Sequence, residues 1–242
     1  KELKPQAGSL VITKVDRGYD LGTVTLAGAL VAVQMKRKKI KAESDKIGTI
    51  LRLANQEEID VWHASRAKEA EVQKRARELA IALKLNMKLS DVEFQGDGKK
   101  ATFYYTADKR VDFRQLIKDM ARAFSIRIEM RQIGLREEAS RLGGIGSCGR
   151  ELCCSTWLTD FRSVNIAAAR YQQLSLNPQK LAGQCGRLKC CLNYELEVYR
   201  SALKAFPKAE VKLQTEKGIG VFQKMDMFKG LILDYLIHQE AL

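Results

Sequence analysis

All six cysteines of the 242-residue chain lie in two short segments of nearly identical sequence. Residues 148–154 read CGRELCC, and residues 185–191 read CGRLKCC. The two copies align position for position, which indicates that both serve the same chemical purpose. Cysteine thiolates are ligands of structural zinc and of iron–sulfur clusters, and both kinds of centre take four ligands. Two half-sites on two loops could therefore converge on one metal centre.

Other interpretations of the repeat stay open. Disulfides require an oxidising compartment, whereas this chain is neither small nor visibly secreted. Buried structural thiols are common, but they give no reason for the repeated glycine and arginine. A thiol redox enzyme is conceivable, although no pair has the C-x-x-C spacing. Structural zinc prefers two residues between paired cysteines, whereas four separate Cys148 from Cys153. This spacing favours a cluster over zinc.

The number of thiols exceeds the four that one centre needs. Adjacent side chains on a helix point roughly 100° apart, so both members of a Cys-Cys pair rarely reach one ion. Apolar residues at helical spacing after each motif place Cys154 and Cys191 nearer the core. All six are candidate ligands, and the favoured quartet is Cys148, Cys153, Cys185 and Cys190. Two separate centres, each completed by a partner chain, explain the surplus equally well.

The glycine and arginine of each motif have their own predicted roles. Gly149 and Gly186 follow the first cysteine of each copy and let the backbone turn closely around a ligated sulfur. Arg150 and Arg187 come next and place a cation near the negatively charged thiolates. Such a cation stabilises the thiolate form and tunes the potential of a cluster.

The chain is strongly basic, with a net charge of +13 and an isoelectric point near 9.5. Such a field attracts polyanions, and nucleic acid is the first candidate. The densest basic run is Lys36, Arg37, Lys38, Lys39 and Lys41, a candidate nucleic-acid contact where a strand is expected to end. The same residues would equally protect an edge strand or aid solubility. No apolar run approaches the roughly 18–20 residues of a membrane span, so we expect a protein that does not cross one.

Both ends of the chain have the pattern of short β-strands. Residues 8–34 alternate β-branched runs with glycines, and so do segments 211–213, 217–222 and 230–233. Isolated three-stranded meanders are marginally stable, so pairing the two ends would protect their edges. We therefore expect one small β-barrel-like lobe formed from both ends.

The middle of the chain predicts an α+β sandwich. A long helix is expected over 57–85, followed by a hairpin of 92–94 and 101–106 around an Asp-Gly turn. A helix over 113–124 and a strand over 125–130 complete it. The expected fold class is α+β, divided into an N-terminal β lobe (1–56), the sandwich (57–133), the helical and loop-rich cysteine region (134–204) and a C-terminal β segment packed on the first lobe (205–242).

Several sequence blocks occur together in one known family. They are RVDFR (110–114), RIEMRQIG (127–134), LGGIG (142–146), LSLNP (174–178) and the two cysteine motifs. On these blocks the chain resembles the bacterial YaaT/RicT family, whose members carry the PSP-one C-terminal homology domain. The resemblance spans about residues 8–200.

The resemblance implies a cytoplasmic regulatory scaffold without established catalysis of its own. Members of this family act in a complex with two small helical partners, YmcA and YlbF, which carries oxygen-sensitive 4Fe–4S clusters and has been associated with FAD. That complex directs endoribonuclease Y in RNA processing, and a role in a developmental phosphorelay has been proposed. All six cysteines match the family pattern. The alternative expectation is a zinc-bound or metal-independent nucleic-acid-binding or assembly module.

Overall fold

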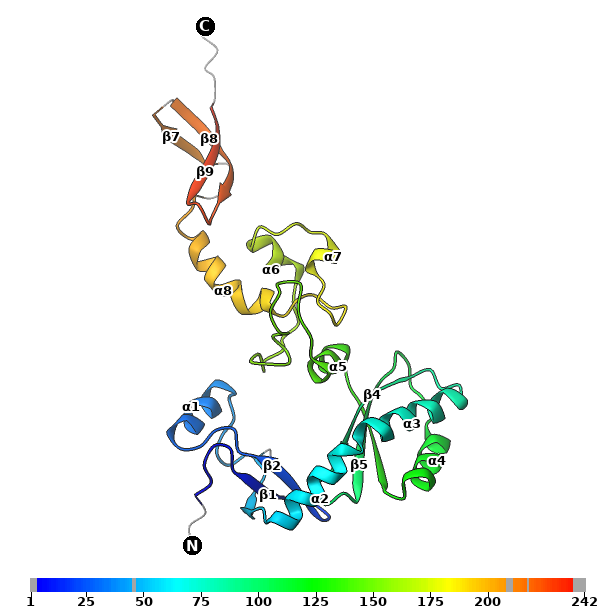
Figure 1. Cartoon of the computed structure of the whole chain (residues 1–242). Coiled ribbons are helices and arrows are strands. Elements are labelled where there is room, and N and C mark those ends of the chain that lie inside the picture. Colours follow the sequence, from blue (N-terminus) through cyan, green and yellow to red (C-terminus); the bar gives the residue numbers. More distant parts are fainter. Residues whose placement is uncertain (1–3, 45–46, 208–210, 217, 237–242) are drawn as a thin grey trace. The chain divides into compact units, whose positions relative to one another are not determined.

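The structure, a computed structural model, describes residues 4–44, 47–207, 211–216 and 218–236. The chain divides into two compact units, Lys1–Asp160 and Phe161–Leu242, which are described in turn. The predicted mixed α+β class is confirmed, with three-stranded sheets and short helices in the described residues (Figure 1). None of the helices described is long and apolar enough to cross a membrane.

The first unit opens with a small antiparallel sheet. Its strands are β1 (Leu10–Lys14), β2 (Tyr19–Thr23) and β3 (Ile50–Leu53), in the order β2-β1-β3. Val11, Ile12 and Leu21 are its buried residues. Between β2 and β3 the chain forms helix α1 (Ala29–Arg37), which has no buried residue.

The expectation of a strand in residues 30–33 is wrong, because this segment belongs to α1. The β-branched Val31 and Val33 stand among strong helix formers such as alanine, leucine, glutamine and methionine, whose combined helix propensity prevails. The basic run therefore begins in the last turn of a helix and not at the end of a strand.

The larger part of the first unit is the α+β sandwich that the sequence predicts. The elements are α2 (Gln56–Ala67), α3 (Glu69–Ala82), β4 (Lys88–Phe94), β5 (Lys100–Thr106), α4 (Arg114–Phe124), β6 (Arg127–Gln132) and α5 (Leu135–Leu142). The strand order is β4-β5-β6, in which β4 pairs antiparallel with β5, and β6 pairs parallel with β5 after the crossover helix α4. The predicted hairpin, helix and strand are thus confirmed.

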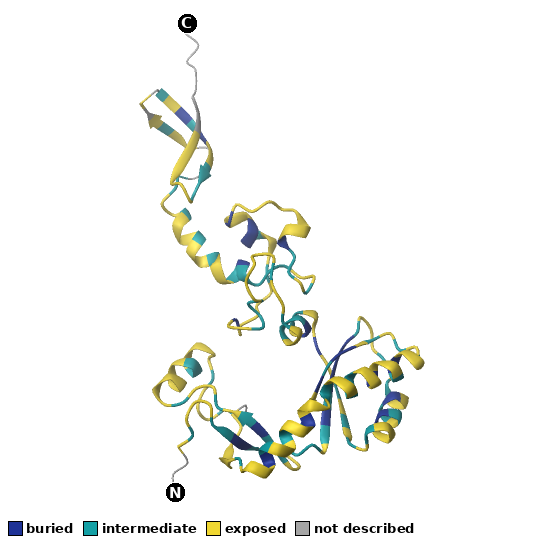
Figure 2. Cartoon of the chain, viewed as in Figure 1, coloured by how far each residue is buried: buried dark blue, intermediate teal, exposed yellow. Residues whose placement is uncertain are grey.

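Helices α3 and α4 cover one face of this sheet (Figure 1). Their buried residues Ala76, Ala80, Leu116 and Met120 pack with Phe103 of β5. Figure 2 shows buried residues in dark blue along β4 and β5, where this core lies. The single long helix predicted over 57–85 is instead two helices, α2 and α3, which meet at Lys68.

The second unit contains short helices and a C-terminal sheet. The helices are α6 (Ile166–Tyr171), α7 (Pro178–Leu181) and α8 (Cys191–Leu203), and the strands are β7 (Lys212–Thr215), β8 (Gly218–Asp226) and β9 (Leu231–Leu236). A small core of Ala168, Ala169, Leu181 and Leu192 joins the three helices. The buried Gln172 side chain donates to the Leu192 carbonyl at 2.6 Å and links α6 to α8.

The expectation that strands from both chain ends pair in one small β-barrel-like lobe is wrong. In the described residues the strands β1–β3 and the strands β7–β9 form two separate sheets. The third strand beside β1 is β3, from the same end of the chain, and β7, β8 and β9 pair with one another. Each of these two sheets is therefore built from strands of one end of the chain. Lys217, which begins one predicted strand, lies outside the described residues. The four-part domain division, and the packing of 205–242 on the first lobe, stay predictions.

Candidate functional site

The two cysteine motifs form the same tight loop, although one lies in each unit. In the first loop the Gly146 N–H donates to the Arg150 carbonyl at 2.8 Å, and in the second Gly183 donates to Arg187 at 2.8 Å. The turns inside them also match, because Gly149 donates to Gly146 at 2.9 Å and Gly186 donates to Gly183 at 3.0 Å. The backbone repeat therefore begins two residues before the first cysteine.

The flanks of the two loops correspond as well. Ile145 forms an antiparallel bridge with Glu151, and Ala182 forms the equivalent bridge with Leu188. Outside each bridge one further backbone bond of 3.0 Å closes the loop, from Leu152 to Gly144 and from Lys189 to Leu181. Each motif is thus a miniature hairpin with the first cysteine at its tip and the Cys-Cys pair after it. The shared scheme confirms that the sequence repeat is a structural repeat.

Glycines shape both loops. Gly149 has φ +77° and Gly186 has φ +71°, the left-handed region that the predicted turn needs. Gly146 and Gly183 matter for a different reason. A Cβ on Gly146 would lie 3.4 Å from the Cys148 Sγ, and one on Gly183 would lie 3.7 Å from the Cys185 Sγ. The sulfur of each first cysteine therefore rests over a glycine. The motif did not predict this contact, although in both copies a glycine stands two residues before the first cysteine.

The six thiols are partly accessible, and none forms a disulfide. Cys148 is exposed, and the other five are half-buried. Cys190 is the N-cap of α8 and Cys191 is its first residue, so the helical spacing predicted after the second motif is confirmed. The same prediction after the first motif is wrong, because residues 153–157 form turns and not a helix. Leu188, Leu192 and Leu196 lie on the face of this segment that packs on the small core, as its apolar spacing predicts.

The donor chemistry of the loops suits a thiolate-ligated centre, but neither loop completes one alone. Among the described residues, no group of three or more histidine, cysteine, aspartate or glutamate side chains is arranged to hold a metal ion. A four-thiolate centre therefore needs sulfurs from both loops or from another chain. The quartet of Cys148, Cys153, Cys185 and Cys190 stays a prediction.

The other predicted site residues lie at the surface. Arg150 and Arg187 are exposed, and their carbonyls close the two loops. The basic run is exposed at the end of α1, where Lys36 and Arg37 form the last turn and Lys38 is the C-cap. Cations are favourable at the negative end of the helix dipole, which gives this run a local structural role. Among the described residues, no single site contains both this basic run and a cysteine loop.

A charged cluster that the sequence analysis did not single out anchors the helix before the first loop. The Arg141 guanidinium of α5 lies 3.5 Å from the centre of the Tyr104 ring and pairs with Asp91 at 3.0 Å. The Tyr104 hydroxyl donates to Glu93 at 2.8 Å. Burial, followed by this hydrogen bond, raises the pKa of Tyr104 to about 12. The tyrosine therefore stays protonated and keeps donating even at alkaline pH near 10, where an ordinary tyrosine is half ionised.

A second anchor on the same helix is Glu138. It accepts hydrogen bonds from the Ser90 hydroxyl at 2.6 Å and from the Lys88 ammonium at 2.9 Å. Burial alone would raise the pKa of Glu138, but these two hydrogen bonds, together with the positive charges of Lys88 and Arg77, lower it below its ordinary value. From the same helix, the Ser140 hydroxyl donates to the Cys154 carbonyl at 2.5 Å. Helix α5 thus connects the sheet directly to the first cysteine loop.

Comparison with known proteins places these features in a family. The sequence profile of the PSP1 C-terminal conserved region matches residues 48–133, and that of the third domain of PSP1-like proteins matches residues 163–206. Stage 0 sporulation protein YaaT of Bacillus subtilis is 42% identical over 236 residues, which are 96% of this chain and 82% of that protein. The chain belongs to the YaaT family. The predicted family resemblance is confirmed.

Two eukaryotic proteins share shorter parts of this YaaT-family chain. An uncharacterised protein of Schizosaccharomyces pombe is 29% identical over 146 residues, covering 50% of the chain and 19% of that protein. Protein PSP1 of Saccharomyces cerevisiae is 51% identical over 45 residues, covering 19% of the chain and 5% of that protein. No solved structure matches. The two profiles include β3 to β6 and the second cysteine loop, whereas the first loop lies between them.

Proposed function

We propose that this YaaT-family chain is a non-catalytic regulatory scaffold whose two cysteine loops bind a thiolate-ligated metal centre. A 4Fe–4S cluster is the favoured occupant, and zinc is the alternative. The observation that carries the proposal is the duplicated loop, because one backbone scheme presents the same thiols twice. The name of the Bacillus subtilis relative, a stage 0 sporulation protein, supports a regulatory role.

The residues that would hold the centre are the loop cysteines, with Cys148 and Cys185 at the two tips. Their thiols are accessible enough to meet a ligand, and neither is locked in a disulfide. A bound cluster would supply one-electron redox chemistry and sensitivity to oxygen. The exposed Arg150 and Arg187 would provide positive charge beside the thiolates.

The remaining parts of the proposal come from the family. The chain would act in the cytoplasm with small helical partners of the YmcA and YlbF type and would modulate RNA processing by endoribonuclease Y. FAD would be a cofactor of this chain or of its complex. Flavin released from an anaerobically purified complex, and absent from each separate component, would assign FAD to the complex.

Anaerobic purification with metal and sulfide analysis tests the central claim. We expect a brown protein that contains iron and acid-labile sulfide, and we expect Cys148→Ser and Cys185→Ser to lose the colour. Ser147→Ala, an exposed change beside the first cysteine, is the matched control and should keep the metal. A colourless protein with stoichiometric zinc would overturn the cluster, and a protein free of metal under these conditions would overturn the metal centre.

A second candidate function is metal-independent binding of nucleic acid. The net charge of +13 and the exposure of Lys36, Arg37, Lys38, Lys39 and Lys41 favour it. RNA affinity should then fall steeply with salt, and charge reversal of this run should weaken binding while cysteine variants leave it intact. Binding that is unchanged by charge reversal would refute a role for this run.

A further inference from the structure

Two β-turns of the first unit interlock through specific hydrogen bonds. The Gln95 side-chain amide, in the β4–β5 turn, donates to the carbonyls of Arg17 at 2.9 Å and Tyr19 at 3.2 Å. The Gly96 N–H donates to the Asp20 carboxylate at 2.9 Å. A Cβ on Gly96 would lie 2.5 Å from the Leu21 nitrogen, so only glycine permits this approach. The β1–β2 turn is therefore held firmly against the larger sheet.

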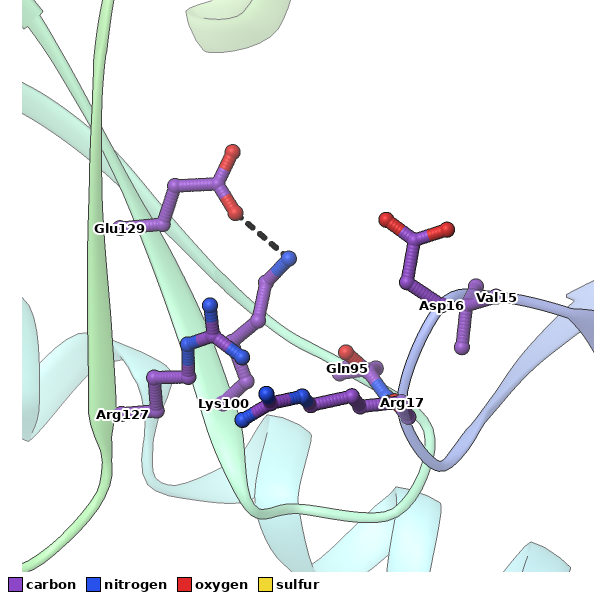
Figure 3. Close-up of a pocket in the computed structure, with 7 residues that line it drawn as sticks. All are labelled: Val15, Asp16, Arg17, Gln95, Lys100, Arg127 and Glu129. Atoms are coloured by element: carbon purple, nitrogen blue, oxygen red, sulfur yellow. Dashed lines mark hydrogen bonds and ion pairs between the residues drawn. The ribbon is translucent and has the colours of Figure 1, made fainter.

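A cavity of about 490 Å³ lies beside this contact. The β1–β2 turn contributes Val15, Asp16 and Arg17, and the larger sheet contributes Gln95, Lys100, Arg127 and Glu129 (Figure 3). Ligand pockets usually measure about 300–1,000 Å³, so the volume of this cavity is in the range that accommodates a ligand the size of a nucleotide. Because Gln95 both fixes the turn and lines the cavity, the cavity wall is held in place by the interlocked turns.

Only some of the charged side chains that line this cavity form ion pairs among the described residues. The Lys100 ammonium forms an ion pair with Glu129 at 2.5 Å. Within the part of the chain that the structure describes, the guanidinium groups of Arg17 and Arg127 have neither an ion pair nor a side-chain hydrogen bond. Figure 3 shows both reaching toward Lys100, while the Asp16 carboxylate lies across from them. Arg17 and Arg127 are exposed, and two guanidinium groups directed to one place form a positive surface that attracts an anion.

We propose that this cavity binds the phosphate ester of a nucleotide, either free or within a single-stranded nucleic acid. Arginine presents a planar fork of donors that matches phosphate oxygens, so Arg17 and Arg127 would clamp the phosphate. The carboxylates of Asp16 and Glu129 would accept hydrogen bonds from base or sugar donors, which inorganic phosphate lacks. The cysteine loops contribute no residue to the cavity, so this proposal is independent of the metal centre.

Binding titrations of the full chain test the proposal. In one arm, fluorescence anisotropy measures the binding of a labelled single-stranded oligouridylate. In the other arm, calorimetry measures the binding of uridine monophosphate. Inorganic phosphate is a further probe. Arg17→Gln and Arg127→Gln should each weaken binding about tenfold, since a charged hydrogen bond has that effect. The double variant should lose more than either. Lys118→Gln, an exposed change of the same charge on α4, is the matched control and should bind like the parent chain.

The outcomes separate the two sources of the phosphate. Arginine-dependent binding of the oligonucleotide alone assigns a polynucleotide, and arginine-dependent binding of the mononucleotide assigns a free nucleotide. An unaltered affinity in the double variant, or no binding of any phosphate ester by the parent chain, would overturn the proposal. Far-ultraviolet circular dichroism confirms folding of the variants. The double variant should retain the metal content of the parent chain, whereas Cys148→Ser should retain its phosphate affinity, so the two proposals fail separately.

Discussion

At the scale of single residues, each cysteine loop contains two glycines with different surroundings. Gly149 and Gly186 adopt positive φ, whereas Gly146 and Gly183 lie beneath the sulfur of the first cysteine, where an added Cβ would make an ordinary van der Waals contact. The turn glycines were predictable from the motif, because a glycine directly after the first cysteine of each copy indicates a tight backbone turn. The sulfur-supporting glycines were not, because their role depends on a contact between residues that only the folded loop brings together.

Replacing the turn glycines should weaken the loops. A Cβ in the left-handed region costs roughly 1–2 kcal/mol, so Gly149→Ala and Gly186→Ala should each lower the free energy of unfolding by about that amount. Metal content should fall with it if the loops hold a centre. Chemical denaturation and metal analysis measure the two effects. Gly22→Ala is the control, because Gly22 has no positive φ and nothing lies within 4 Å of the added Cβ. Equal stability of all three variants would contradict this account of the loops.

At the scale of elements, local patterns predicted most of the sandwich and the strands β1, β2, β7, β8 and β9 near the two ends, but neither β3 nor the way these strands pair. The hairpin around Asp97 and helix α4 follow from turn chemistry and from apolar spacing over neighbouring residues. The position of β3 could not be predicted in this way, because Ile50–Leu53 is defined by its pairing with β1 across more than thirty residues. Long-range pairing, and not propensity, decided the strand order.

The start of helix α2 should make stability depend on acidic pH. Asn55 and Glu58 form a capping box, and Arg52 pairs with Glu58 at 2.6 Å. Hydrogen bonds from Arg52 and then from the Asn55 N–H lower the pKa of Glu58 to about 2, from an ordinary value of 4.5. Because the folded pKa is depressed, this stabilisation is complete above pH 4.5 and is lost as the pH falls toward 2.

Unfolding of Glu58→Gln by urea over this pH range checks the effect. The variant should be less stable than the parent chain at pH 7, and the difference should shrink as the pH falls below 4.5. Glu57→Gln changes the same charge in the same turn, outside the capping box, and serves as control. A stability difference that does not change with pH would exclude the ionised Glu58 as its source.

Helix α5 should be held to the sheet by its arginine. Arg141 stacks on Tyr104 and pairs with Asp91 and Glu93. A partly buried cation–π contact with supporting ion pairs contributes about 1–2 kcal/mol, so Arg141→Ala should destabilise the unit by that order. Hydrogen exchange should rise first in α5 and in the first cysteine loop. Arg122→Ala is the control, because Arg122 is largely exposed and has only a 3.7 Å pair with Asp119. Unchanged exchange in α5 would contradict this anchoring role.

At the scale of the whole molecule, the two units differ in how much core supports them. Ten buried residues form the main cluster of the first unit, whereas four form the helical cluster of the second, among the residues described. Small domains with little core commonly need a metal or a disulfide as an additional constraint, and none of the six cysteines is in a disulfide. A metal bound by the second cysteine loop would therefore stabilise the weaker unit most.

A centre shared by both loops of one chain has a testable consequence for metal stoichiometry and unfolding. Metal binding to the folded loops stabilises them, so metal-loaded protein should melt at a higher temperature than chelated protein, and in chelated protein the second unit should unfold first. Cys148→Ser, in the first unit, should abolish metal binding as completely as Cys185→Ser in the second, because each removes a ligand of the same centre.

Anaerobic metal analysis per chain, calorimetry and light scattering measure these effects. If each variant instead keeps half of the metal in an oligomeric protein, each loop forms its own centre with a partner chain, and the shared centre is refuted.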